Sequence, residues 1–151
     1  TANQGYRGQN AAGSYSGPGG GSGGEGQTYV YPTQGFGGPG NAVNIISASN
    51  ATTSSVGEVS GSDVYFASGG SGLNYADAQV GGGGNNASGD ANSGGGGGAI
   101  YNTSARSGGS GVVILRMPSG NYSGVTTGSP DVYTEGSDTV IVFKGTGTYT
   151  H

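Results

Sequence analysis

The side chains able to do acid–base or nucleophilic chemistry are few and scattered. The one histidine, His151, is the last residue, where fraying would leave a catalytic base without a fixed position. Glycoside hydrolysis needs two carboxyl groups, one with a raised pKa, and no acidic residue lies in an apolar stretch that would raise it. The acidic residues are Glu25, Glu58, Asp63, Asp77, Asp90, Asp131, Glu135 and Asp138. We therefore predict solvated carboxylates and no enzyme.

Ligand-binding motifs are equally weak. The glycine runs are never followed by the Gly-Lys-Ser/Thr element of a phosphate-binding loop, so no nucleotide is expected. Asp77, Asp90 and the nearby Asn85, Asn86 and Asn92 are hard oxygen ligands that suit calcium. However, neither the EF-hand spacing nor a nonapeptide repeat is present, and turn formation explains these residues. The prediction is no metal site and no cofactor.

Charge and composition exclude further classes of protein. Only Arg7, Arg106, Arg116 and Lys144 are basic and the formal net charge is −4, which argues against nucleic acid as a partner. No apolar run approaches the length of a membrane span, so no membrane insertion is expected. Without cysteine there is no disulfide framework. Because the sequence starts at Thr1 without a leader, we expect a processed or excised piece.

Tyrosine is the residue type that favours binding. The sequence has ten tyrosines, and this side chain is rigid and amphipathic, which suits contacts with sugars and proteins. Four of them lie in segments flanked by glycine-rich runs: Tyr29, Tyr31, Tyr75 and Tyr101. We predict these four as receptor-binding residues. The alternative is that they cap glycine-rich layers and form the core themselves.

The elements that would position these tyrosines are dominated by glycine. Of the 38 glycines, 32 lie in residues 1–111, with uninterrupted runs at 81–84 and 94–98. Such runs disfavour helix, which leaves a flexible linker or an extended, polyproline-II-like chain whose segments approach closely. Short β-prone segments between the runs favour the ordered alternative.

The last forty residues predict strands. Residues 112–117 and 139–144 are apolar runs typical of strands buried on both faces. Residues 131–134 precede the second run across a short polar loop, as in a hairpin, and 148–150 would be a closing strand after the chain folds back. Residues 41–56 lack glycine but are rich in Asn, Ser and Thr, which favour turns over helix interiors.

We therefore expect a mainly β fold with irregular glycine-rich, polyglycine-II-like packing, a small C-terminal antiparallel sheet and no helices. The predicted organisation is a glycine-rich packed scaffold with short strands at 1–111 and an antiparallel β-subdomain at 112–151. The scarcity of large apolar residues, 22 of Val, Ile, Leu and Phe together, favours contacts between subunits.

Several segments carry a resemblance to a known family. Residues 5–12, 62–70, 94–98, 108–116 and 142–150 resemble, in this order, the glycine-rich domain of bacteriophage tail and tail-fibre proteins. Residues 73–92 depart from it, because the family tends towards more continuous glycine there. The resemblance implies a non-enzymatic structural or receptor-binding module of a virion tail fibre. It also implies an extracellular location and a host-surface glycan or outer-membrane protein as partner. The small number of large apolar residues favours homo-oligomerisation, with a trimer expected for a fibre and a monomeric cap as the alternative.

The same sequence features are also compatible with a second class of function. Glycine-rich backbone packing with exposed strand edges also suits a self-assembling extracellular filament or adhesin subunit. Glycosylation would require a secretory compartment, and the number of acceptor triplets is close to chance. The triplets begin at Asn50, Asn86, Asn102 and Asn121.

Overall fold

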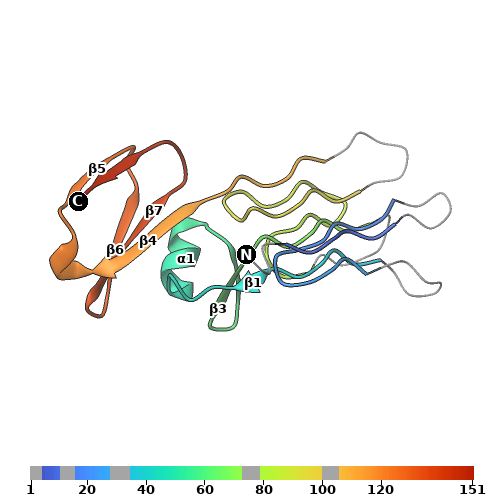
Figure 1. Ribbon diagram of the computed structural model, residues 1–151, viewed down its shortest axis with the longest axis horizontal. Helices are drawn as coiled ribbons and strands as arrows, with labels where there is room; N and C mark the ends of the chain where they lie inside the picture. Colours follow the sequence, from blue (N-terminus) through green and yellow to red (C-terminus); the bar gives the residue numbers. More distant parts are fainter. Residues whose placement is uncertain (1–4, 11–15, 28–34, 73–78, 100–105) are drawn as a thin grey trace.

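The computed structural model describes residues 5–10, 16–27, 35–72, 79–99 and 106–151. Within these residues the protein is mainly β, with three small antiparallel sheets, one short α-helix and a 3-10 turn. The prediction of no helices and of one small C-terminal sheet was wrong on both points. Figure 1 shows the sheets at one end of the molecule and glycine-rich segments lying side by side at the other.

The largest sheet has the strand order β4-β7-β6. Strands β6 (Asp131–Glu135) and β7 (Asp138–Phe143) form a hairpin around Gly136, whose φ of 64° suits glycine. Strand β4 (Val113–Pro118) pairs with the other side of β7. Five of the six residues of β7 are buried, which explains its apolar run, whereas no residue of β4 is buried.

The end of the chain pairs differently from the prediction. Strand β8 (Thr148–Thr150) does not return along β7 but pairs with β5 (Val125–Thr127) in a separate sheet of two strands. The preceding 3-10 turn η1 (Ser119–Asn121) leads to Tyr122, whose ring stacks on Tyr149 with centroids 6.0 Å apart. Pairing partners depend on contacts distant in sequence, and local propensity carries little information about them.

The third sheet comes from the first part of the chain. Strands β2 (Glu58–Ser60) and β3 (Asp63–Phe66) form a hairpin, and the short strand β1 (Asn41–Ala42) pairs with the other side of β3. The order is therefore β1-β3-β2. Val64, on the central strand, is fully buried.

Helix α1 (Ala48–Ser54) occupies the stretch for which turns were predicted. Ser47 caps its start by accepting a hydrogen bond from the Asn50 N–H at 3.4 Å, and Ser55 ends it in the left-handed conformation with φ 56°. The Thr52 hydroxyl donates back to the Ala48 carbonyl at 2.9 Å, within the helix. The polar residues that disfavour a helix interior thus cap and brace this short one.

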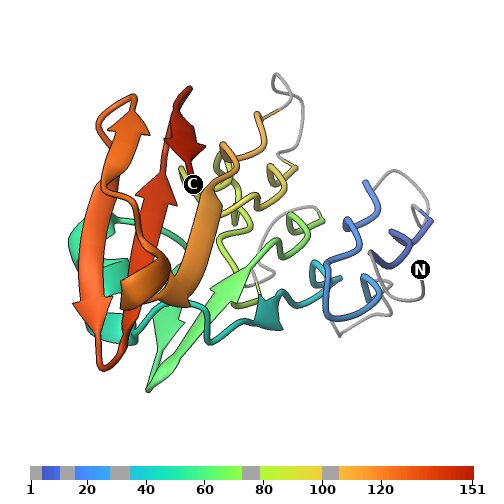
Figure 2. The same cartoon turned by 60° about the vertical axis from the view of Figure 1, so that its left-hand side comes forward.

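The hydrophobic core joins the helix to two sheets. Ile46, Ala51, Val56 and Val64 pack with Val140 and Val142 of β7. Figure 2 shows α1 and the β2–β3 hairpin on one side of the β4-β7-β6 sheet. The core therefore contains residues from both sides of Gly111.

The glycine-rich segments are joined directly through their backbones. Residues 68–72 are buried, and their backbone groups are hydrogen-bonded to four neighbouring segments. The Gly19 N–H donates to Gly70 at 3.1 Å, and the Gly69 N–H donates to Gly38 at 2.8 Å. On the other side, the Gly96 N–H donates to Ser68 at 2.9 Å and the Ser71 N–H to Gly84 at 3.1 Å. These bonds between segments take the place of a strand ladder.

Glycine makes this packing feasible because it has no side chain. A Cβ on Gly70 would lie less than 3.0 Å from the backbone of Gly97, and one on Gly69 would collide in the same way with Gly19. The carboxylate of Glu58 accepts the N–H groups of Gly81 at 2.7 Å and Gly82 at 2.9 Å, which links the bundle to β2. Glycine is therefore required at these positions for close approach of the backbones.

Candidate functional site

The four tyrosines predicted to bind a receptor, Tyr29, Tyr31, Tyr75 and Tyr101, lie outside the described residues. Of the described tyrosines, Tyr133 and Tyr149 have clear structural roles. The Tyr133 hydroxyl is 2.7 Å from the Ser54 hydroxyl, and the Tyr149 hydroxyl donates to the Asn121 carbonyl at 3.0 Å. Tyr6, on the glycine-rich part, is 40% exposed.

The described segments around these tyrosines share one end of the glycine-rich bundle. The described residues that flank 11–15, 28–34, 73–78 and 100–105 lie on the side away from the C-terminal sheets (Figure 1). Hydrogen bonds hold the flanking chains in pairs, with Gln9 N–H donating to Pro18 at 3.0 Å and Ala99 N–H to Ser71 at 3.0 Å. At this end of the bundle the flanking chains are therefore joined through their backbones.

A first cluster of charged groups lies between α1 and the β6–β7 hairpin. Glu135 Oε1 accepts from the Ser47 N–H and from Asn50 Nδ2, both at 2.8 Å. Its other oxygen accepts from Arg116 Nη1 at 2.8 Å, and Arg116 Nε donates to Asp138 at 2.8 Å. Burial of Glu135 opposes its ionisation, but the hydrogen bonds from Ser47 and Asn50 and the charge of Arg116 together lower its pKa.

A second cluster fastens the other end of the helix. Asp131 Oδ2 accepts from Lys144 Nζ and from the Ser54 hydroxyl, both at 2.8 Å. The hydrogen bonds from Lys144 and then Ser54 lower the pKa of Asp131. Lys144 Nζ also donates to the Ser54 carbonyl at 3.2 Å.

The chemistry of both clusters suits fastening and gives no support to catalysis. A general acid at neutral pH needs a carboxyl group with a raised pKa, whereas the pKa values of Asp131 and Glu135 are lowered. The buried Ser54 hydroxyl faces a carboxylate and a phenol, with no histidine to activate it. Asn50 uses its Nδ2 in the contact with Glu135, so this potential glycosylation acceptor is already engaged.

The described residues contain neither a metal-binding cluster nor a membrane-spanning helix. No group of three or more His, Cys, Asp and Glu side chains could hold a metal ion there. In that same part of the chain, no helix has the length and apolar character needed to cross a membrane.

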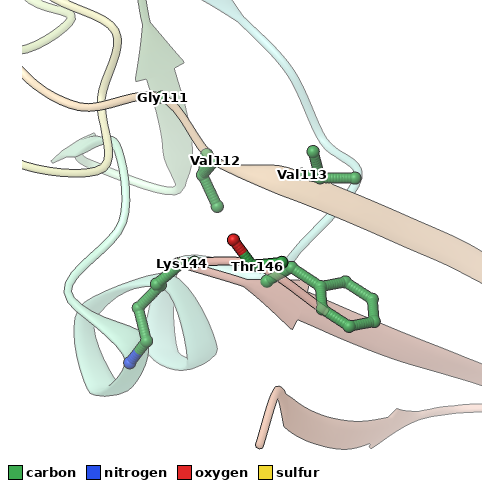
Figure 3. Close-up of a pocket in the computed structure, with 7 residues that line it drawn as sticks. Gly111, Val112, Val113, Lys144 and Thr146 are labelled. Carbon is green, nitrogen blue, oxygen red and sulfur yellow. The ribbon is translucent and has the colours of Figure 1, made fainter. Parts of the chain in front are cut away.

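Three hollows in the surface lie next to strand β4, and another lies in the glycine-rich bundle. One of about 490 Å³ lies where β4 begins and β7 ends (Figure 3). It is lined by Gly111, Val112, Val113, Phe143, Lys144, Gly145 and Thr146.

Val113 is 57% exposed, although its apolar run predicted a strand buried on both faces. The prediction was wrong because β4 lies at the edge of its sheet, and periodicity alone does not distinguish an edge strand from a central one.

Comparison of the chain with known protein families, curated proteins and solved structures finds no match. The resemblance to phage tail proteins therefore rests on the sequence segments quoted above.

Proposed function

We propose that this protein is a non-enzymatic structural and receptor-binding module of a bacteriophage tail fibre, located on the virion outside the host cell. The observation that carries the proposal is the glycine-rich bundle, whose segments are bonded backbone to backbone and end together on the side away from the sheets. Binding residues are often carried on loops that a rigid scaffold positions, and this end of the bundle provides such a scaffold.

The charge clusters are consistent with a passive module. Their carboxylates are engaged by hydrogen bonds and ion pairs within the molecule, which leaves them poorly suited to proton transfer. Under this proposal Tyr29, Tyr31, Tyr75 and Tyr101 contact a host-surface glycan or an outer-membrane protein. Aromatic residues suit this role because they bury a large area at low entropic cost.

Binding to host-derived glycans and to host cell envelopes tests the proposal. We expect wild-type protein to bind, and both Tyr75→Ala and Tyr101→Ala to weaken binding about tenfold or more, as loss of an aromatic contact implies. Tyr6→Ala, which removes an exposed tyrosine outside the four, is the matched control and should bind as wild type. Circular dichroism checks that all variants fold.

Two results would contradict the proposal. Wild-type protein that binds neither glycans nor envelopes would remove the receptor-binding role. Long uniform fibres of purified protein in negative-stain images would instead support the self-assembling filament or adhesin subunit.

A further inference from the structure

Strand β4 is an apolar strand that is only partly covered, with Ile114 packed against the core. Its residues include Val113, Ile114, Leu115 and Met117, yet none of the six residues of the strand is buried. Among the described residues, β4 has a paired strand on one side only, since it is the edge of the β4-β7-β6 sheet. An apolar edge of this length is normally a site of unwanted association unless something protects it or pairs with it.

The usual protection of an edge is limited in β4 to Pro118, the last residue of the strand. Its one charged residue, Arg116, directs its guanidinium to Asp138 on the paired strand β7, with Nε 2.8 Å from Oδ2. The same guanidinium reaches Glu135 on β6, with Nη1 2.8 Å from Oε2. The charge of Arg116 is thereby neutralised within the molecule, and the residue puts no unpaired charge on the edge. The opposite edge strand, β6, carries acidic residues at both ends.

Apolar grooves flank β4 on both faces of the sheet. On one face, Val112 and Ile114 line a groove of about 360 Å³ together with Val43, Ile45 and Phe66. On the other face, Val113 and Leu115 line a second groove of about 360 Å³. Its other walls include Phe143 and Tyr149.

A strand added to the edge of β4 would fit this arrangement. Successive side chains of a strand point to opposite faces, so an added strand would place alternate side chains into the two grooves. The hollow in Figure 3 lies at the start of β4, and the Lys144 side chain leads away from it towards α1. Its ammonium group is bound to Asp131 and Ser54, so it adds no free charge to the hollow.

We propose that β4 pairs antiparallel with β4 of a second copy of this chain around a two-fold axis, joining the two sheets into one. β4 is itself apolar on both faces, so each copy supplies the side chains that the grooves of the other accept. Because Arg116 is neutralised within its own chain, the pairing brings no unpaired like charges together. Strand β6 would fit the grooves less well, since its residues Asp131 and Glu135, although ion-paired within the chain, are costly to bury against apolar walls.

The association state of the protein tests this pairing. Sedimentation equilibrium should show a monomer–dimer equilibrium. We expect Val113→Lys to raise the dissociation constant about 100-fold or more, because its ammonium would lie unpaired at an apolar interface. Val125→Lys is the matched control: Val125 is 56% exposed against 57% for Val113, and it lies on β5, outside the proposed interface. It should leave the dissociation constant unchanged.

Single cysteine substitutions locate the two-fold axis, since the sequence contains no other cysteine. In a two-fold antiparallel pair, a residue near the axis faces its own copy within the Cα distance that a disulfide requires. Among Val113→Cys, Ile114→Cys and Leu115→Cys, we expect oxidation to give a covalent dimer most efficiently at one position. Thr134→Cys, exposed on the opposite edge strand, should give none.

The proposal fails if wild-type protein stays monomeric at millimolar concentration, or if it forms trimers or open filaments. It also fails if Val113→Lys dimerises as wild type does. The pairing does not depend on receptor binding, so a dimer that binds no glycan would contradict the proposed function alone.

Discussion

At the residue scale, Glu135 is the group on which the docking of α1 most depends. Its two oxygens contact the N-cap residue Ser47, the helix residue Asn50 and Arg116 of β4. Hydrogen bonds to charged groups contribute more than neutral ones because they are shorter and electrostatically stronger. Glu135→Gln removes the charge and leaves Arg116 with Asp138 alone.

We expect Glu135→Gln to lower the free energy of unfolding at pH 7 by about 1–3 kcal/mol, measured by urea titration.

The pKa values of Glu135 and Asp131 are lowered from ordinary values of 4.5 and 3.8, so the unfolded chain binds more protons as the pH falls below about 4.5. Their stabilisation is complete above that pH and is lost as the pH falls through the lowered values. Wild type should therefore lose stability in acid, and Glu135→Gln should lose less.

The control for this residue is Glu25→Gln. Glu25 pairs with Arg7 at 3.2 Å, but the two side chains are 46% and 75% exposed. Exposed ion pairs contribute little because water screens them. A large effect of Glu25→Gln, or an unchanged acid response in Glu135→Gln, would contradict the assignment.

At the element scale, the glycine-rich segments are held by backbone contact, and this makes individual glycines indispensable. We expect Gly70→Ala to destabilise the protein by more than about 2 kcal/mol, because a methyl group there would overlap the backbone of Gly97 and overpacking strains such a site. Gly111→Ala is the control, since a Cβ at Gly111 would meet nothing within 4 Å. Equal stability of the two variants in thermal unfolding would show that the bundle is loosely packed.

At the scale of the whole molecule, the core connects elements that are far apart in the sequence. Val64 of β3 belongs to the same cluster as Val140 and Val142 of β7. We expect Val64→Ala to lower the free energy of unfolding by about 1–3 kcal/mol and to speed amide exchange in β7 as well as β3. Val59 is paired with Val64 in the hairpin but is 37% exposed. Val59→Ala should therefore change the free energy of unfolding and the amide exchange rates only a little. Faster exchange confined to β3 would contradict a shared core.

Some of this architecture could be predicted from local sequence. The apolar runs at 112–117 and 139–144 and the hairpin partner predicted at 131–134 correspond to β4, β7 and β6, because apolar runs and short hairpin loops are properties of neighbouring residues. For the candidate site, composition singled out four tyrosines, but their geometry lies outside the described residues. The fastening role of Glu135 was not predicted, because its partners Ser47 and Asn50 lie more than eighty residues away in sequence.

The sequence by itself determined the extended segments at 112–117, 131–134 and 139–144 and where glycine disfavours helix, since both follow from side-chain sterics within a few residues. Only the tertiary structure decided that residues 48–54 form a helix, that β8 pairs with β5, and that β4 lies at an edge. The physical reason is that each of these outcomes depends on a distant partner. The helix is stabilised by the core and by Glu135, and a strand becomes central or peripheral only when its neighbours pair with it.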